Sequence, residues 1–114
     1  MSASIFRHAA AGNGPLAESF VVPSGATYRV ISVELHLNAA CTTQAEYLTV
    51  THDSIDSALC DTVIYRIDLA SSATVDLLWQ PDGDLYLLGG DGLDVDWVNT
   101  QGRTWGLMVT MEAQ

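Results

Sequence analysis

Short β-rich segments with alternating apolar residues are separated by polar turns about eight times between Phe20 and Met111. No segment shows the 3.6-residue period of an amphipathic helix, and regularly spaced short strands are typical of antiparallel sandwiches and small barrels. The expected strands are residues 17–22, 27–37, 46–52, 61–69, 75–79, 84–88, 92–98 and 103–111. We therefore predict an all-β fold, an antiparallel jelly-roll-like β-sandwich of about eight strands, with an up-and-down barrel as the alternative topology.

The alternation within these segments assigns each side chain to one face of the sandwich. In residues 27–37 the odd-numbered apolar residues from Ile31 onward are expected inward, and Glu34 and His36 outward. In residues 61–69 the inward set starts at Val63. The inward register also contains three tryptophans, for which core packing is the preferred interpretation: Trp79, Trp97 and Trp105. The outward register contains three tyrosines that are candidates for surface contact: Tyr28, Tyr47 and Tyr86.

The N-terminal segment differs in composition from the rest of the chain. Residues 1–16 are mostly small or turn-forming. The larger side chains among them, which could contact another protein, are Ile5, Phe6, Arg7 and His8. Such a segment is either a frayed terminus or an arm that becomes ordered on a neighbouring subunit. A chain of 114 residues can bury one two-layer core. We therefore predict an N-terminal arm over residues 1–16 and a single β-sandwich domain over residues 17–114.

The charge of the chain is strongly negative. It carries fourteen Asp and Glu residues against four Arg and no Lys, for a formal charge of −10. This charge repels phosphate backbones and anionic lipids, so we expect neither a nucleic-acid nor a membrane partner. The first residues lack the apolar core of a secretory signal, and we expect synthesis in the cytoplasm. Cys41 and Cys60 are expected at opposite ends of a sheet, too far apart for a disulfide, and therefore free.

The apolar content is high for so small a domain. Hydrophobic residues make up 48% of the chain and charged residues only 16%, against a usual charged share of about 25%. A thin sandwich cannot bury all of these apolar side chains, and exposed apolar patches usually mark interfaces. We therefore expect an oligomer or a protein that docks on a larger assembly. Three apolar residues on the outward register are the candidates for the oligomer interface: Ile64, Leu78 and Leu88.

The residues that could carry chemistry do not form a recognised site. Asp91, Asp94 and Asp96 supply the hard oxygen atoms that Ca²⁺ favours, but their spacing does not match an EF-hand loop. The contiguous residues 51–54, which are Thr, His, Asp and Ser, contain the residue types of a hydrolase triad. Adjacent strand residues point to opposite faces, and no nucleophile-elbow motif accompanies them. We predict a protein that is not an enzyme, with no specific metal site and no cofactor.

Several segments resemble a known group of proteins. YLTVTHDS, DTVIYRIDL and GGDGLDVDWVNTQGRTWGLMVTMEA are similar to small β-sandwich structural proteins of tailed bacteriophages, most of all to capsid decoration (cement) proteins. The resemblance covers most of residues 20–113. It implies a homotrimer that binds the major capsid protein on the outer surface of the virion and stabilises the shell. It also implies that the arm residues Ile5, Phe6 and Arg7 contact the capsid.

A second function class fits the same sequence pattern. Outward aromatic residues and the Asp-rich loops are also what a carbohydrate-binding β-sandwich would use, as in a receptor-binding tip or fibre component that employs Ca²⁺. A small hydrolase is the third class, and it would need an exposed nucleophile beside a base. The sequence does not bring such a pair together.

Overall fold

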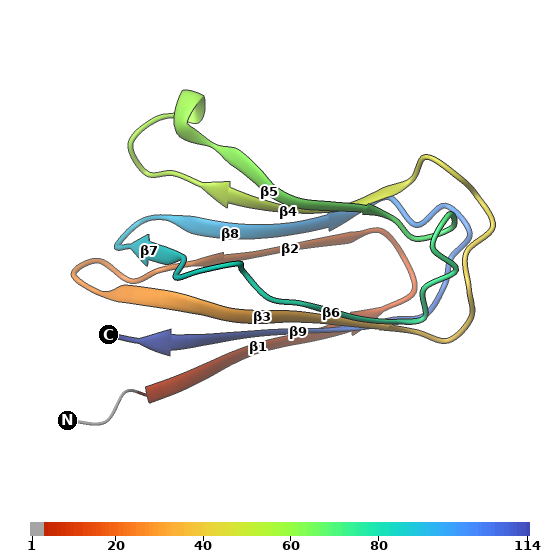
Figure 1. Cartoon of the computed structure of the whole chain (residues 1–114), viewed down its shortest axis with the longest axis horizontal. Helices are drawn as coiled ribbons and strands as arrows, with labels where there is room; N and C mark the ends of the chain where they lie inside the picture. Colours follow the sequence, from red (N-terminus) through yellow and green to blue (C-terminus); the bar gives the residue numbers. More distant parts are fainter. Residues whose placement is uncertain (1–3) are drawn as a thin grey trace.

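The computed structural model describes residues 4–114, which form two antiparallel sheets packed face to face (Figure 1). Sheet A contains, in order, β1 (Ser4–Gly12), β9 (Trp105–Ala113), β3 (Thr27–Leu37) and β6 (Asp76–Trp79), and β7 (Tyr86–Leu88) also pairs with β3. Sheet B contains, in order, β2 (Leu16–Val21), β8 (Gly92–Trp97), β4 (Tyr47–Asp53) and β5 (Thr62–Asp68). A 3₁₀ turn, η1 (Ala58–Cys60), lies in the β4–β5 hairpin. The prediction of an all-β antiparallel sandwich is confirmed.

The core lies between the two sheets and is built from the inward residues of the alternating strands. Leu48 and Val50 of β4 and Val109 of β9 are almost completely buried, as their alternation with polar neighbours predicts. Each such side chain contributes about 1.5–3 kcal/mol by leaving water. Trp97 and Trp105 are also buried, in agreement with the predicted inward register. Both cysteines are free, as predicted: Cys41 is buried and Cys60 is exposed.

A β-bulge in β3 changes which residues of this strand face the core. The pairing of β3 with β9 shifts between Val30 and Ser32, so Ile31 is an extra residue in the ladder. Before the bulge the even-numbered residues Tyr28 and Val30 are buried, and after it the odd-numbered residues are. An inserted residue reverses the side-chain alternation. The expectations that Ile31 faces inward and that Tyr28 faces outward are therefore both wrong.

A second bulge has the same effect on β5. Val50 of β4 pairs with Tyr65, whereas the next residue, Thr51, pairs with Val63, so Ile64 is the extra residue. Val63 is 54% exposed instead of buried. Ile64 is half-buried and packs against the core. The predicted placement of Val63 inward and Ile64 outward is therefore reversed in the structure.

The predicted flexible arm is instead largely a strand. Residues Ser4–Gly12 form β1, and all of them pair with β9 in one continuous antiparallel register. Strand pairing satisfies backbone donors and acceptors whatever the side chains are, so an alanine-rich segment can be ordered in this way. The turn that follows is fixed by the carbonyl oxygen of Gly14, which accepts a bond from Nε1 of Trp105 at 2.9 Å. Residues 1–3 lie outside the described part of the chain.

Aromatic side chains close the two open edges of the sandwich. At one edge the ring of Phe6 stacks on Tyr28 with 5.0 Å between centroids, and Tyr28 stacks on Phe20 of the opposite sheet at 5.7 Å. At the other edge Tyr65 of sheet B stacks on Trp79 of sheet A at 5.4 Å. Offset stacking of this kind adds about 0.5–1.5 kcal/mol beyond the area that the rings bury. The rings therefore cover the core where the backbone leaves it open.

The bulge in β3 can be tested with two substitutions on one strand. We expect Leu35→Ala, at a buried position, to lower the free energy of unfolding by about 2–5 kcal/mol. Ile31→Ala, at the bulge, is expected to lower it by about 1 kcal/mol or less, because Ile31 lies outside the core cluster. Urea denaturation followed by tryptophan fluorescence measures both values. An equal or larger loss at Ile31 would contradict the register described here.

Candidate docking surface

The outer face of sheet A carries several large apolar side chains that the sandwich leaves uncovered. Leu78 of β6 is 60% exposed and Leu88 of β7 is 57% exposed, and Tyr86 of β7 is also exposed. All three point outward because their neighbours Leu77, Trp79 and Leu87 point toward the core. The predicted outward placement of Leu78 and Leu88 is therefore correct.

A groove with a volume of about 500 Å³ crosses this face between β6, β3 and β9. Its apolar part includes Leu78 and Met108, and Gly106 deepens it because a Cβ atom there would meet no other atom within 4 Å. Its polar part includes Glu34 and a pair on neighbouring strands, in which Nδ1 of His36 lies 2.5 Å from Oδ1 of Asp76. The groove is open and mostly apolar, which suits contact with a protein surface.

Other ion pairs of sheet A lie toward the N-terminal end of β3, whereas the groove is lined by residues 34–36 of this strand. Arg29 of β3 lies 3.3 Å from the carboxylate of Glu112 and 3.8 Å from that of Asp84. Hydrogen bonds from Gln114 and Arg29 lower the pKa of Glu112 below its usual range. The groove is therefore suited mainly to apolar contact.

The three residues that the resemblance assigns to capsid contact do not share one face. Ile5 pairs with Glu112 and Arg7 with Thr110, so both lie on the outer side of sheet A. Phe6 points to the other side, where it stacks on Tyr28. Ile5 and Arg7 therefore extend the same face as Leu78 and Leu88, whereas Phe6 helps to close the sandwich edge.

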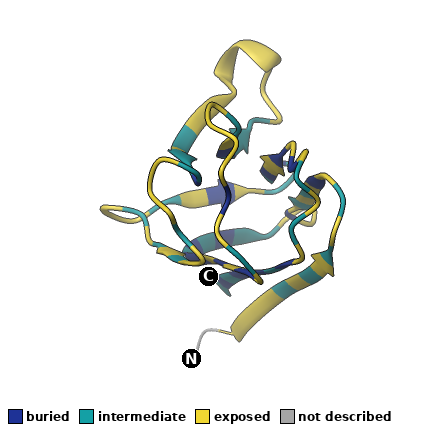
Figure 2. Cartoon of the chain, turned by 90° about the vertical axis from the view of Figure 1, so that its right-hand side faces the viewer, coloured by how far each residue is buried: buried dark blue, intermediate teal, exposed yellow. Residues whose placement is uncertain are grey.

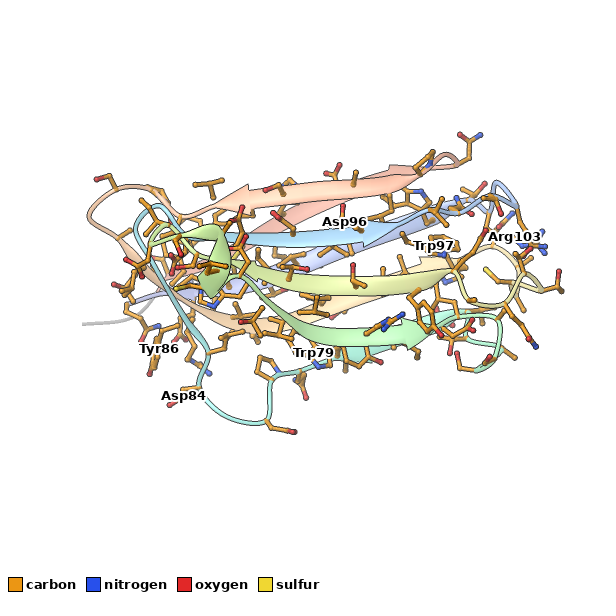
Figure 3. The ribbon with its side chains drawn as sticks, turned by 90° about the horizontal axis from the view of Figure 1, so that it is seen from above. Trp79, Asp84, Tyr86, Asp96, Trp97 and Arg103 are labelled. Carbon is orange, nitrogen blue, oxygen red and sulfur yellow. The ribbon has the colours of Figure 1, made fainter. Side chains whose placement is uncertain are left out.

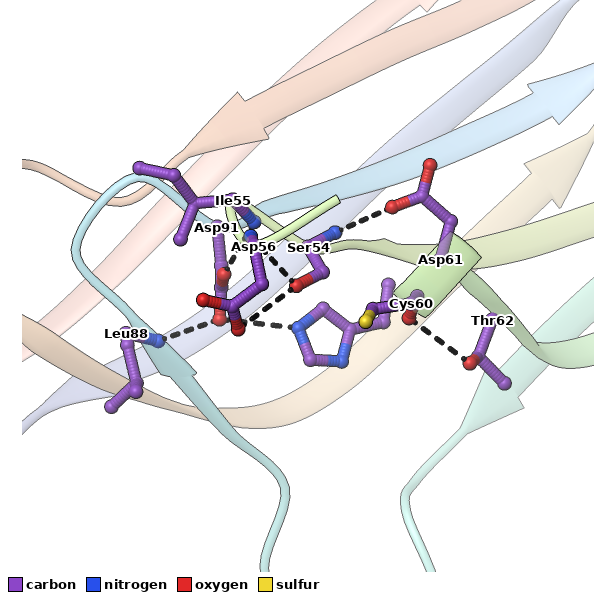
Figure 4. Close-up of polar contacts among 9 residues, drawn as sticks. Ser54, Ile55, Asp56, Cys60, Asp61, Thr62, Leu88 and Asp91 are labelled. Carbon is purple, nitrogen blue, oxygen red and sulfur yellow. Dashed lines mark hydrogen bonds and ion pairs between the residues drawn. The ribbon is translucent and has the colours of Figure 1, made fainter. Parts of the chain in front are cut away.

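Asp91 is a buried carboxylate that holds two loops together (Figure 4). Its Oδ1 accepts a bond from the backbone N–H of Ile55 at 2.9 Å. Its Oδ2 accepts bonds from the N–H of Leu88 at 3.0 Å and from Nε2 of His52 at 3.2 Å. The bond from Ile55, followed by those from Leu88 and His52, lowers the pKa of this carboxyl group despite its burial. Asp91 therefore organises the loops and has its oxygen atoms occupied by protein donors.

The glycines around Asp91 permit this arrangement. Gly90 has a φ of +91°, and a Cβ atom there would lie 2.0 Å from Cδ1 of Ile55. At Gly89 a Cβ atom would lie 2.8 Å from the backbone nitrogen of Gly25. The close contacts and the positive φ require glycine at these positions. The presence of glycine at residues 89 and 90 is therefore explained by loop packing.

Asp94 and Asp96 lie apart from Asp91, on the outer face of sheet B. The carboxylate of Asp94 accepts a bond from the hydroxyl of Ser19 at 2.6 Å. Burial and the neighbouring charge of Asp94 raise the pKa of Asp96. The structure does not gather the three candidate residues, and residues 4–114 contain no cluster of three or more side chains that could hold a metal ion.

The residue types of a hydrolase triad at residues 51–54 are also not assembled. The ring of His52 is directed to Asp91, and the hydroxyl of Ser54 bonds to the backbone and side chain of Asp56. Ser54 and Asp61 instead stabilise the turn, because the N–H of Ser54 donates to the carboxylate of Asp61 at 2.7 Å (Figure 4). These contacts are those of a hairpin loop.

The tip of the β4–β5 hairpin is an exposed feature that the sequence analysis did not select. The hairpin projects beyond the sandwich, and its tip is exposed throughout (Figures 1 and 2). Leu59 in η1 is 97% exposed, and Ile55 is also exposed. The available signal was the presence of two large apolar residues within an otherwise polar turn, residues 53–61.

Replacing the buried carboxylate tests its structural role. We expect Asp91→Asn to lower the free energy of unfolding at pH 7 by about 1–3 kcal/mol, because an amide NH₂ replaces one of the acceptors for buried donors. The pKa of Asp91 is lowered in the folded state, so its contribution is present above the unfolded pKa of about 3.9 and is lost as pH falls through the folded pKa.

The difference between the wild-type protein and Asp91→Asn should therefore shrink below about pH 4. Urea denaturation at a series of pH values measures it, with Asp82→Asn as the control because Asp82 is an exposed turn residue. A difference that does not change with pH would contradict the assignment.

Comparison with known proteins provides no family assignment. No model of a known protein family matches the chain, and a search of curated proteins finds no match. Within residues 4–114 there is also no helix that is both long and apolar enough to cross a membrane.

Proposed function

We propose that this chain is a non-enzymatic structural protein that assembles with copies of itself and docks on a larger protein assembly. The observation that carries the proposal is a set of exposed apolar side chains along one edge of sheet A, here called the strip: Leu78, which lines the groove, and Tyr86 and Leu88, which lie farther along β3. A soluble protein that leaves such residues uncovered along a sheet edge is prone to pair through them. The second copy of this chain is the first occupant we assign to the strip.

The edge position of these residues supports self-association. Strands β6 and β7 both pair with β3 and have no strand on their other side among the described residues. The chain contains no Lys, the residue that most often protects sheet edges. A trimer, as in decoration proteins, would cover this edge and would present several docking faces at once. Simultaneous contacts raise the total affinity of an assembly beyond that of each face.

The specific role that we propose is that of a capsid decoration protein on the outer surface of a tailed-phage virion, bound to the major capsid protein. The sequence resemblance supports this role, and the order of the strands agrees with it. If β6 and β7 are counted as one interrupted strand, consecutive strands lie in opposite sheets except for the β4–β5 hairpin, as in two interlocked Greek keys. We infer from this order that the winding is that of a jelly roll.

The carbohydrate-binding alternative has less support from the aromatic residues. Trp97 and Trp105 are buried, and so is Tyr28. The ring of Tyr47 is already covered by the guanidinium of Arg66, which lies 3.7 Å from its centroid. Stacking on a sugar requires a free ring face, which the three buried residues do not provide.

Self-association can be measured with matched substitutions. We expect the wild-type protein to be an oligomer by size-exclusion chromatography with light scattering. Leu78→Asp should weaken association by about tenfold or more, because it places a charge in an apolar interface. Leu59→Asp, on the distant hairpin tip, makes the same chemical change at a more exposed leucine and should leave association unchanged. A wild-type protein that stays monomeric at all concentrations would contradict the proposed assembly.

The virion role can be tested in the native source. Antibodies raised against the purified chain should detect it in density-purified phage particles, and gold-labelled antibodies should bind the outer shell in electron micrographs. The washed particles should lose the chain under conditions that leave the major capsid protein assembled. If the chain were found only outside particles, the proposed virion role would be rejected.

A further inference from the structure

A second cavity lies at the opposite side of β6 from the groove, at the sandwich edge where β5 and β6 approach each other. We name it the edge cavity, and it has a volume of about 300 Å³. This is at the lower end of small-molecule sites, which suits one side chain better than a larger ligand. It is lined by Ile64, Trp79, Pro81, Asp82, Gly83, Asp84 and Leu85.

The aromatic wall of the edge cavity is the indole of Trp79. Tyr65 stacks on this indole with an angle of 22° between the planes, and Tyr65 does not line the cavity. Tyr65 therefore covers one face of the ring, and another part of Trp79 lines the cavity. Trp79 is only half-buried, unlike Trp97 and Trp105, so its ring is accessible to a ligand.

The polar wall of the edge cavity consists of two carboxylates on the turn after β6. Asp82 is exposed and makes no ion pair within residues 4–114. The side chain of Asp84 is 65% exposed and lies 3.8 Å from a guanidinium nitrogen of Arg29. Figure 3 shows Trp79 and Asp84 along the same side of the molecule. The cavity thus combines an aromatic ring with one unpaired and one partly paired negative charge.

This combination is complementary to a guanidinium group. The planar cation of arginine stacks on aromatic rings and donates two parallel hydrogen bonds to carboxylates, and its methylene groups pack against apolar walls. The formal charge of −10 also attracts cationic surfaces over a distance of several ångströms. We propose that the edge cavity binds an arginine side chain that projects from a protein partner.

The proposal deepens the docking role by naming the chemistry of the partner, and it rests on that role only in taking the partner to be a protein. The arginine site and the proposed self-association can be disproved separately. Self-association concerns the outer face of sheet A, whereas the edge cavity is tested below with a small probe that requires neither an oligomer nor a capsid.

The probe is N-acetyl-arginine methylamide, titrated into the ¹⁵N-labelled full chain and followed by two-dimensional NMR. The three tryptophans give three indole N–H signals. We expect the Trp79 signal to move with saturation in the millimolar range. The Trp105 signal should stay in place, because its Nε1 is bonded to the carbonyl oxygen of Gly14 inside the protein. The matched citrulline derivative, which is neutral and nearly isosteric, should cause no saturable shift.

Substitutions assign the binding to the two walls of the cavity. Asp82→Asn should raise the dissociation constant about three- to tenfold by removing the unpaired charge. Asp56→Asn, which makes the same change on the hairpin, should leave it unchanged and thereby controls for the total charge. Trp79→Leu keeps an apolar wall but removes the ring, and it should abolish binding as measured by calorimetry. If this variant does not fold, Asp82→Asn alone decides the matter.

Three results would overturn the proposal. The first is a Trp79 shift that does not saturate, and the second is an equal response to the citrulline derivative. The third is an unchanged affinity in Asp82→Asn. If methyl glucoside moved the Trp79 signal with saturation and the arginine probe did not, the edge cavity would be a carbohydrate site and the arginine assignment would be rejected.

Discussion

The pairing of β9 with both β1 and β3 is the interaction on which the rest of the structure depends. β9 lies between these two strands along its whole length, and its inward residues supply four side chains to the core: Trp105, Leu107, Val109 and Met111. The remaining strands of sheet A, β6 and β7, are attached only through β3. β9 also places Gly106 and Met108 across β3 from β6, so the groove of the docking face exists only when this strand is in place.

The fold class could be predicted from the sequence because alternation is a local property. The positions of the eight expected strands follow from it, and so does the burial of Leu48 and Trp97. The faces of two strands could not be predicted in full, because one inserted residue reverses the alternation. Ile31 and Ile64 are such residues, and nothing in the neighbouring sequence distinguishes a bulge from a regular strand. The error is therefore confined to the segments around the two bulges.

β1 was missed for a different reason. Its residues are mostly small and do not alternate clearly between apolar and polar types, so the local sequence predicts a flexible segment. Its order comes from the backbone of β9, which is about a hundred residues away in the chain, as the pairing of Phe6 with Met111 illustrates. A partner at that separation leaves no signature in the local sequence. The same holds for the turn after β1, whose carbonyl at Gly14 is held by Trp105.

The candidate sites show that the same type of polar residue can either stabilise a loop or line a binding site. In the sequence, Asp91 is a candidate metal ligand. In the structure, its carboxylate oxygen atoms accept hydrogen bonds from Ile55, Leu88 and His52. The edge cavity, in contrast, joins Trp79 to a turn that follows it directly in the chain. Its carboxylates were visible in the sequence as acidic turn residues. Their position beside a half-exposed ring required the packing of β5 against β6.

The central place of β9 has a consequence for how the sandwich forms. A ribosome makes β9 after every other strand of the sandwich, so β1 and β3 have unpaired edges until β9 emerges. Pairings between such distant segments form slowly, and unfinished sheets with free edges are prone to aggregate. The excess of negative charge then has a role before the protein is folded, because it keeps neighbouring unfinished chains apart. The negative charge of this chain therefore acts during its synthesis as well as on the surface of the folded protein.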